Sequence, residues 1–160
     1  MGKVKAIPEG YSAITPHLTV RGAAQAIEFY RQAFGAEELV RMPTANGKIM
    51  HAELRIAGSM IMLADENIEM GSPSPQTLGG TTGGVMLYVE SVDQVFDRAV
   101  KAGAKPLMPP ADMFWGDRFG TIVDPFGHKW SMATHIRDVS PEEMKKAQAE
   151  FEKQMAAQKP

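Results

Sequence analysis

Two ionisable side chains near the middle of the chain have the type and spacing for proton transfer. His51 and Glu53 are separated by one residue within the alternating run 48–57, so both lie on the same face of a predicted strand. An imidazole beside a carboxylate can act as a general base with its partner, and we predict these two residues as catalytic candidates. The alternative is a polar strand face at a solvent or subunit boundary.

A third candidate, His17, lies in the predicted strand 14–20. The apolar face of that strand carries Ile14, Leu18 and Val20, and its mixed face carries Thr15, His17 and Thr19. If His17, His51 and Glu53 converge, they can bind a borderline metal ion. The alternative is that both histidines are hydrogen-bonded residues in or around a ligand-binding cup.

Further ligand-binding candidates come from residues 114–118. Arg118 can grip a carboxylate or phosphonate through its guanidinium fork, or it can pair structurally with Asp117 or Asp124. Phe114 and Trp115 lie in a loop flanked by proline and glycine. There they can cover a flat ligand, or they can pack under the loop as part of the core.

Methionines and one tyrosine complete the candidate set. Strand parity directs Met86 and Tyr88 to the same side as the proposed cup, and with Met60 and Met62 they would form an adaptable, polarizable wall. The alternative is that these methionines belong to the apolar core. Gly79–Gly80 and Gly83–Gly84 form no phosphate loop, because neither a Lys-Ser/Thr pair nor a helix follows.

The elements that position these residues occur twice. Each unit is predicted as a strand, a helix and three further strands. In the first unit these are the strand 14–20, a helix 22–34 and strands 37–43, 48–57 and 59–64. In the second they are the strand 85–89, a helix capped by Ser91 and ended by Gly103, and strands 105–109, 116–123 and 129–134. A capping box at 140–143 begins a terminal helix.

Landmarks of the two units recur at a nearly constant offset. Val20 and Val89, Ile27 and Phe96, Gly35 and Gly103, and Gly58 and Gly127 are each separated by 68 or 69 positions. This repeat predicts two copies of one supersecondary unit that bury their cores jointly. The predicted organisation is a first module at 11–70, a linker at 71–84, a second module at 85–138 and a C-terminal helix at 139–160.

Composition excludes several classes of protein. The chain has 160 residues, a formal net charge of −2 and no cysteine. The charge argues against a nucleic-acid surface, and the absence of cysteine excludes disulfides and thiolate metal sites. No apolar run is long enough to cross a membrane, and no signal peptide is evident, so we expect a cytoplasmic protein.

Several short segments resemble the vicinal oxygen chelate superfamily, which includes glyoxalases, bleomycin-resistance proteins and dioxygenases. Residues 16–20, 27–30 and 34–36 resemble the opening of these proteins, and Asp124-Pro125-Phe126-Gly127-His128 resembles the turn before their last strand. Residues 114–118 resemble the PhnB-like branch. The resemblance implies an α+β fold of tandem βαβββ modules, in which a curved, cup-shaped mixed sheet carries helices on its convex face. It also implies a homodimer.

The resemblance also indicates where a metal ion would bind. Metal-dependent members use His, Gln or Glu on the first and last strands of each module, and the matching positions here are Thr15, Met62, Gly84 and Ser131. None of these is a good ligand for Zn²⁺ or Ni²⁺, so no metal ligand or cofactor is assigned. Thr15, Met62 and Ser131 are instead predicted to line the cup.

Three functions remain open at this point. The first is a small-molecule-binding protein, similar to the bleomycin-resistance type, without the usual metal site. The second is a metal-dependent, glyoxalase-like lyase or isomerase, or a dioxygenase, with a displaced site at His17, His51 and Glu53. The third is a structural or interaction protein whose cup is filled. The fold alone does not choose among them.

Overall fold

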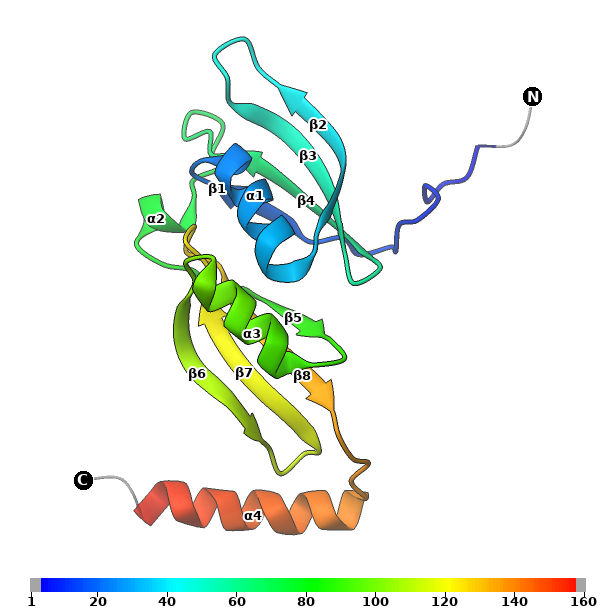
Figure 1. The fold of residues 1–160 in the computed structure, drawn as a ribbon, viewed down its shortest axis with the longest axis vertical. Coiled ribbons are helices and arrows are strands. Elements are labelled where there is room, and N and C mark those ends of the chain that lie inside the picture. Colours follow the sequence, from blue (N-terminus) through cyan, green and yellow to red (C-terminus); the bar gives the residue numbers. More distant parts are fainter. Residues whose placement is uncertain (1–3, 158–160) are drawn as a thin grey trace.

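Each half of the chain forms a four-stranded mixed sheet with one helix packed against it (Figure 1). The computed structural model describes residues 4–157. The elements of the first half are β1 (His17–Val20), α1 (Ala23–Phe34), β2 (Glu37–Pro43), β3 (Ile49–Ile56) and β4 (Ser59–Asp65). Their strand order is β1-β4-β3-β2, with β1 parallel to β4 and the other pairs antiparallel.

The second half repeats this topology with the order β5-β8-β7-β6. Its elements are β5 (Gly84–Tyr88), α3 (Val92–Lys101), β6 (Lys105–Asp112), β7 (Asp117–Val123) and β8 (Lys129–His135). The connection between the halves contains the short helix α2 (Pro75–Leu78), and α4 (Pro141–Ala157) follows the second sheet. The predicted α+β fold of tandem βαβββ modules is therefore confirmed. No helix among residues 4–157 is long and apolar enough to span a membrane.

The internal repeat extends to the hydrogen bonds that begin the two main helices. Asp65 at the end of β4 accepts from the backbone N–H of Ala23 at 2.9 Å. Thr134, 69 positions later, accepts from the N–H of Val92 at 2.8 Å. In each module the last strand thus supplies the side chain that satisfies a free N–H at the helix start. Ser91 was predicted for this role in α3, but its side chain makes no capping hydrogen bond.

The beginning of the first strand differs from the sequence prediction. We expected Ile14 to face α1, but β1 starts only at His17 and the Ile14 side chain is 84% exposed. Pro16 directly precedes the strand, and its missing N–H cannot join the ladder. The capping box of α4 is confirmed, since the N–H of Ser140 donates to Glu143 and the N–H of Glu143 donates back to the Ser140 hydroxyl.

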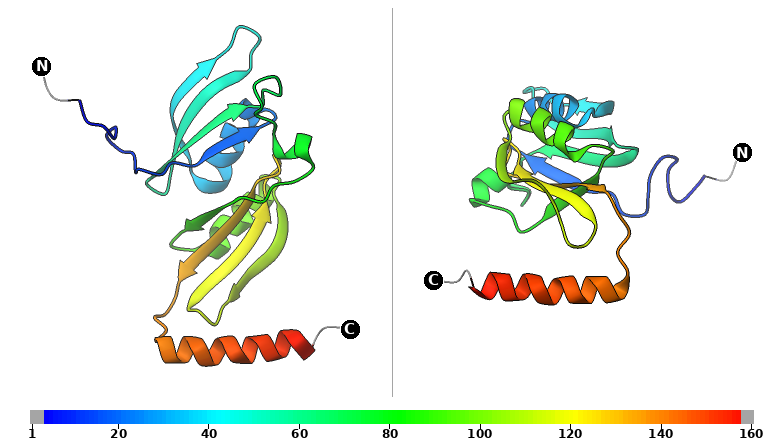
Figure 2. Two further views of the ribbon diagram at one scale, coloured as in Figure 1. Left: turned by 180° about the vertical axis from the view of Figure 1, so that it is seen from behind. Right: turned by 60° about the horizontal axis from the view of Figure 1, so that its bottom comes forward.

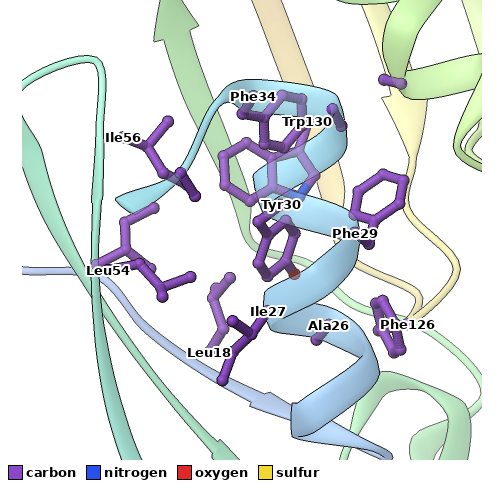
Figure 3. Packing of buried hydrophobic residues seen from close by; sticks show 14 of the residues in the cluster. Leu18, Ala26, Ile27, Phe29, Tyr30, Phe34, Leu54, Ile56, Phe126 and Trp130 are labelled. Carbon is purple, nitrogen blue, oxygen red and sulfur yellow. The ribbon is translucent and has the colours of Figure 1, made fainter. Parts of the chain in front are cut away.

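Aromatic side chains of the core gather where α1 meets the second module (Figure 3). Trp130 of β8 is fully buried, and its ring lies 4.5 Å from that of Phe34 and 5.3 Å from that of Tyr30. The sequence predicted Trp130 under a helix, and that helix belongs to the other module. Contacts between α1 and α3 complete the junction.

A buried carboxylate satisfies the polar groups at this junction. Asp124 accepts from the Tyr30 hydroxyl at 2.7 Å and from Trp130 Nε1 at 3.0 Å. It also accepts from two backbone N–H groups of its own turn, those of Phe126 and His128. A buried charge is tolerated when its hydrogen-bonding capacity is used in this way. The junction is therefore held by both packing and directed hydrogen bonds.

Both sheets carry their helices on one side and leave the other side uncovered (Figure 2). We call the helix-free side of the β1–β4 sheet the first open face and that of the β5–β8 sheet the second open face. The two faces lie side by side and point the same way, so the sheets do not close around a common cup within one chain. β1 and β5 are both edge strands.

Candidate functional site

The predicted polar residues come together on the first open face. Strand register aligns His17 of β1, Met62 of β4 and Glu53 of β3 in one row across the sheet. His51 lies one row further along β3, opposite Met42 of β2. Because register partners project to the same side, these five side chains share the open face.

His51 and Glu53 form the pair that the sequence predicted. His51 Nε2 lies 3.1 Å from Glu53 Oε1, and both side chains are about one-quarter exposed (24% and 22%). The neighbouring Tyr11 hydroxyl and His51 imidazole lower the pKa of Glu53, so this carboxyl is ionised at neutral pH. An ionised Glu53 orients the imidazole and makes Nε2 of His51 the protonated nitrogen.

Tyr11 is a member of this site that the sequence analysis missed. It lies in the irregular segment before β1, where no strand or helix pattern indicates its position. Its hydroxyl is buried against Glu53 without a well-aligned hydrogen bond, and the carboxylate raises the pKa of Tyr11 to about 12. Tyr11 therefore stays protonated and partly covers the carboxylate.

His17 lies near His51 but makes no hydrogen bond within the described residues. The two ring centroids are 6.4 Å apart with an interplanar angle of 24°. Desolvation and the neighbouring imidazole lower the pKa of His17, which favours its neutral form. Glu53 is engaged by His51 and Tyr11, and among residues 4–157 no group of three or more His, Cys, Asp or Glu side chains is arranged to hold a metal ion.

The second open face has the same geometry and a different chemistry. Register places Met86, Ser131 and Thr121 in one row, matching His17, Met62 and Glu53 of the first face. Phe119 of β7 corresponds to His51. A cavity of about 370 Å³ opens beside Met86, Phe119 and Ser131, a size within the range of small-ligand pockets.

The predicted aromatic loop continues this surface. Trp115 makes an edge-to-face contact with Phe119, with centroids 5.7 Å apart, and Phe114 packs on Trp115 at 5.1 Å. Phe114 also contacts Phe151 of α4 at 5.4 Å. Both loop aromatics are half-buried, so they are packed in part and still border the second open face.

A hydrogen-bonded network that the sequence did not reveal lies at the far end of this face. The Tyr88 hydroxyl donates to the buried carboxylate of Asp117 at 2.9 Å. His135 bridges Asp117 at 2.8 Å and Asp138 at 3.1 Å, and these carboxylates raise the pKa of His135. Only pairing of β5, β7 and β8 brings these residues together, so no local spacing could have indicated the network.

Of the predicted ligand-binding residues, Arg118 lies away from the open faces and Thr15 lies outside the strands. Arg118 projects from the helix side of β7, where its guanidinium makes two hydrogen bonds to Asp93 of α3, both at 2.7 Å, and one to Asp112 at 2.9 Å. The predicted structural partners of Arg118, Asp117 or Asp124, are therefore both wrong. Thr15 precedes β1 and is bonded weakly to the backbone of Ser12.

A second cavity, also about 370 Å³, lies where the two modules meet. It is bordered by the segment before β1, by the β3–β4 turn and by the exposed edge of β5, including Met86 and Tyr88. These two side chains are 43% and 57% exposed. The edge of β5 is therefore accessible from both the open face and the module junction.

Comparison with known proteins agrees with this architecture. The model of the Glyoxalase/Bleomycin resistance protein/Dioxygenase superfamily matches residues 12–132. The chain belongs to this superfamily. An uncharacterised protein of Mycobacterium tuberculosis, Rv0887c, is 46% identical over 138 residues, which cover 84% of this chain and 81% of that protein.

Solved structures share the fold of this chain. TioX from Micromonospora sp. ML1 is 30% identical, with a TM-score of 0.61 over 78% of this chain and 99% of TioX. A PhnB protein from Bacillus cereus, described as a putative 3-demethylubiquinone-9 3-methyltransferase, is 20% identical with a TM-score of 0.59 over 77% of this chain and 99% of its own. The second likeness concerns the fold alone.

The donor set at the superfamily's metal positions does not fit a borderline or hard divalent ion. Met62 and Ser131 occupy equivalent last-strand positions, and Gly84 at the start of β5 has no side chain. Thr15 lies outside β1. A thioether and neutral hydroxyls are weak ligands for Zn²⁺, Ni²⁺ or Mn²⁺. We therefore derive no chemistry through such an ion.

Proposed function

We propose that this protein binds a small organic molecule between a first open face and a second open face. Binding would not use the superfamily's usual divalent-metal centre. The observation that carries the proposal is the contrast between the matched faces. One presents His17, His51 and Glu53, and the other presents a cavity bordered by Met86 and Phe119. Such a pair suits a ligand with a polar group at one end and a flat apolar body at the other.

The proposal includes a second copy of the chain. Within one chain the open faces point the same way, so neither is covered by the other (Figure 2). The strands β1 and β5 each leave one edge unpaired, and an unpaired edge is a template for another strand. Pairing β1 of one copy with β5 of another would bring a polar and an apolar face together in each of two cups.

The binding test is a thermal-shift screen of metal-free protein against aromatic antibiotics and small carboxylates, followed by calorimetric titration of each hit. A ligand at 100 times its Kd stabilises the folded state by about 2.7 kcal/mol, which is easily measured. We expect binding to weaken in Phe119→Ala and to persist in Ile136→Ala, an exposed residue outside the cavity. Hits that bind both variants equally, or a cup that yields no hit, would contradict the proposal.

The assembly test is the molar mass in solution from light scattering during gel filtration. We expect twice the chain mass of 17.5 kDa. Replacing Met86 by aspartate places a charge at the exposed edge of β5, where we expect it to shift the protein toward the monomer. A wild-type protein that elutes as a monomer at all concentrations would refute the paired arrangement.

A second candidate function, proton transfer to or from the bound ligand, rests on the His51–Glu53 hydrogen bond. Glu53 holds His51 in one tautomer, which leaves Nδ1 of His51 as the basic nitrogen. If a screened ligand is turned over, His51→Gln should abolish turnover and retain binding. Undiminished turnover in that variant would exclude His51 as the base.

A further inference from the structure

The first open face gathers imidazole and thioether groups in one place. His17 and Met62 are direct register partners on β1 and β4, and the rings of His17 and His51 lie 6.4 Å apart on either side of β4. Met42 is the register partner of His51 on β2. The face thus combines two imidazoles with two methionine thioethers. The chain has no cysteine, so the sulfur groups of the face are thioethers.

The hydrogen bonding of His51 matches that of a metal-bound histidine. Its Nε2 lies 3.1 Å from the Glu53 carboxylate, so in the tautomer that donates Nε2–H to Glu53 the Nδ1 lone pair is free. Histidines that bind metals generally donate their other N–H to a carboxylate or carbonyl, which fixes the ring. His17 makes no hydrogen bond within residues 4–157, so its nitrogens are available as well.

The spacing of the rings allows a shared ion. Metal–imidazole bonds are about 2.0–2.1 Å long, so two imidazoles sharing an ion hold their ligating nitrogens at most about 4 Å apart. The ring centroids lie 6.4 Å apart, so sharing an ion requires the solvent-exposed His17 side chain to turn toward His51. Met62 lies on the strand between them and is half-buried, with its side chain on the same face.

The ligand types select the ion. Thioether sulfur is a soft donor that favours Cu(I), and neutral imidazole is a common copper ligand. We propose that His17, Met62 and His51 form a site for one Cu(I) ion on the first open face, with Glu53 as the residue that positions His51. This site goes beyond the proposed binding of an organic ligand, and it uses a different donor set from the divalent centre considered above.

The second open face provides a built-in control. The positions equivalent to His17, Met62 and His51 are Met86, Ser131 and Phe119, which supply one thioether and no imidazole. The twelve methionines of the chain could also bind Cu(I) weakly and without structure. A true site must therefore depend on the residues of the first face and not on methionine content.

The experiment is an anaerobic titration of the purified protein with Cu(I) in competition with bicinchoninate, a colorimetric Cu(I) chelator. We expect one tight equivalent per chain. Glu53→Gln removes the carboxylate behind a histidine ligand, a change that typically lowers metal affinity by roughly 10–100-fold, and we expect a loss of Cu(I) affinity in that range. His17→Gln and Met62→Leu each remove a ligand and should lower the Cu(I) affinity by more. Met70→Leu, the control, removes an exposed methionine from the connection between the modules and should bind as wild type does.

X-ray absorption of the copper-loaded wild type supplies a measurement that needs no variant. We expect two nitrogen ligands and one sulfur ligand. Absence of a tight equivalent, a spectrum without sulfur, or equal losses in Met62→Leu and Met70→Leu would each overturn the proposal. Organic ligands are screened on metal-free protein, so failure of the copper site leaves that function intact and failure of the screen leaves the copper site intact.

Discussion

The two modules share one backbone plan and differ in the side chains on their open faces. The side chains of Asp65 and Thr134 accept hydrogen bonds from equivalent N–H groups at the starts of α1 and α3. Gly47 and Gly116 lie in equivalent hairpins, 69 positions apart. On the open faces, His17 is replaced by Met86 and His51 by Phe119. The two modules thus share the features that build the fold, while their open faces carry different side chains.

The modules also differ in how they contribute to the junction. The second module supplies Trp130 and the buried Asp124, and the first supplies the aromatic rings of α1 that surround them. Stability should therefore be most sensitive to the turn before β8. Four experiments, in order of decreasing expected effect, test the differences between the modules.

Asp124→Ala should produce the largest loss of stability. It removes the acceptor for the Tyr30 hydroxyl, Trp130 Nε1 and two backbone N–H groups, and leaves these donors buried without a partner. We expect the free energy of unfolding, measured by urea denaturation, to fall by about 3–5 kcal/mol. Arg55→Ala, which breaks an exposed ion pair in the first module, should cost no more than about 0.5 kcal/mol. Similar losses for both would show that the junction is not anchored by Asp124.

Gly116→Ala and Gly47→Ala compare equivalent hairpins of the two modules. Both glycines have positive φ (97° and 80°), so alanine strains each backbone by about 1–2 kcal/mol. At Gly116 a Cβ would lie 2.2 Å from the carbonyl oxygen of Arg137, whereas at Gly47 nothing lies within 4 Å. We expect a clearly lower thermal midpoint for Gly116→Ala than for Gly47→Ala. Equal midpoints would mean that the segment after β8 moves away from the added methyl group without loss of stability.

The pH dependence should separate His17 from His135. Two carboxylates raise the pKa of His135 above its usual value of 6.5, so its stabilising contribution is present below pH 6.5 and is lost as the pH rises through the folded-state pKa. The pKa of His17 is lowered, so its contribution is present above pH 6.5 and is lost as the pH falls through the folded-state pKa.

Urea midpoints between pH 5 and 8 measure these two contributions. His135→Gln should remove the part that declines with rising pH, and His17→Gln should remove the part that declines with falling pH. The two variants should thus change the slope of stability against pH in opposite directions. Parallel changes would contradict the assigned environments of the two histidines.

Removal of α4 should have the smallest effect. None of its side chains is buried, and Phe151, which is 46% exposed, provides an aromatic contact to Phe114. A chain ending at Val139 should lose no more than about 0.5 kcal/mol of unfolding free energy. A large loss would show that α4 stabilises the second module through contacts made in solution.

Much of the fold could be predicted from local sequence patterns. The alternation around His51 and Glu53 placed both side chains on one strand face, and their hydrogen bond confirms the interpretation of that spacing. The limit of such patterns is visible at Ile14, which continues the alternation of β1 but lies outside the strand. Periodicity indicates which residues can share a face of a strand. It does not indicate where hydrogen bonding to the neighbouring strand begins or ends.

The candidate site could be predicted only in part. The binding roles of Met86, Tyr88 and Ser131 remain predictions, although all three lie on the second open face. Arg118 could not be assigned from sequence, because its partners Asp93 and Asp112 come from α3 and β6. Tyr11 was missed because the segment that carries it has no regular structure.

The sequence by itself determined the two-module repeat and the order of the strands with α1, α3 and α4, whereas α2 lies in the segment predicted as a linker. These features depend on the spacing of residues that are close together in the sequence, so local patterns reveal them. Only the tertiary structure decided that Asp124 binds Tyr30, that His135 bridges Asp117 and Asp138, and that His17 approaches His51. Each of these contacts requires strands or helices from separate parts of the chain to meet in one register, and register is set by packing of the whole sheet.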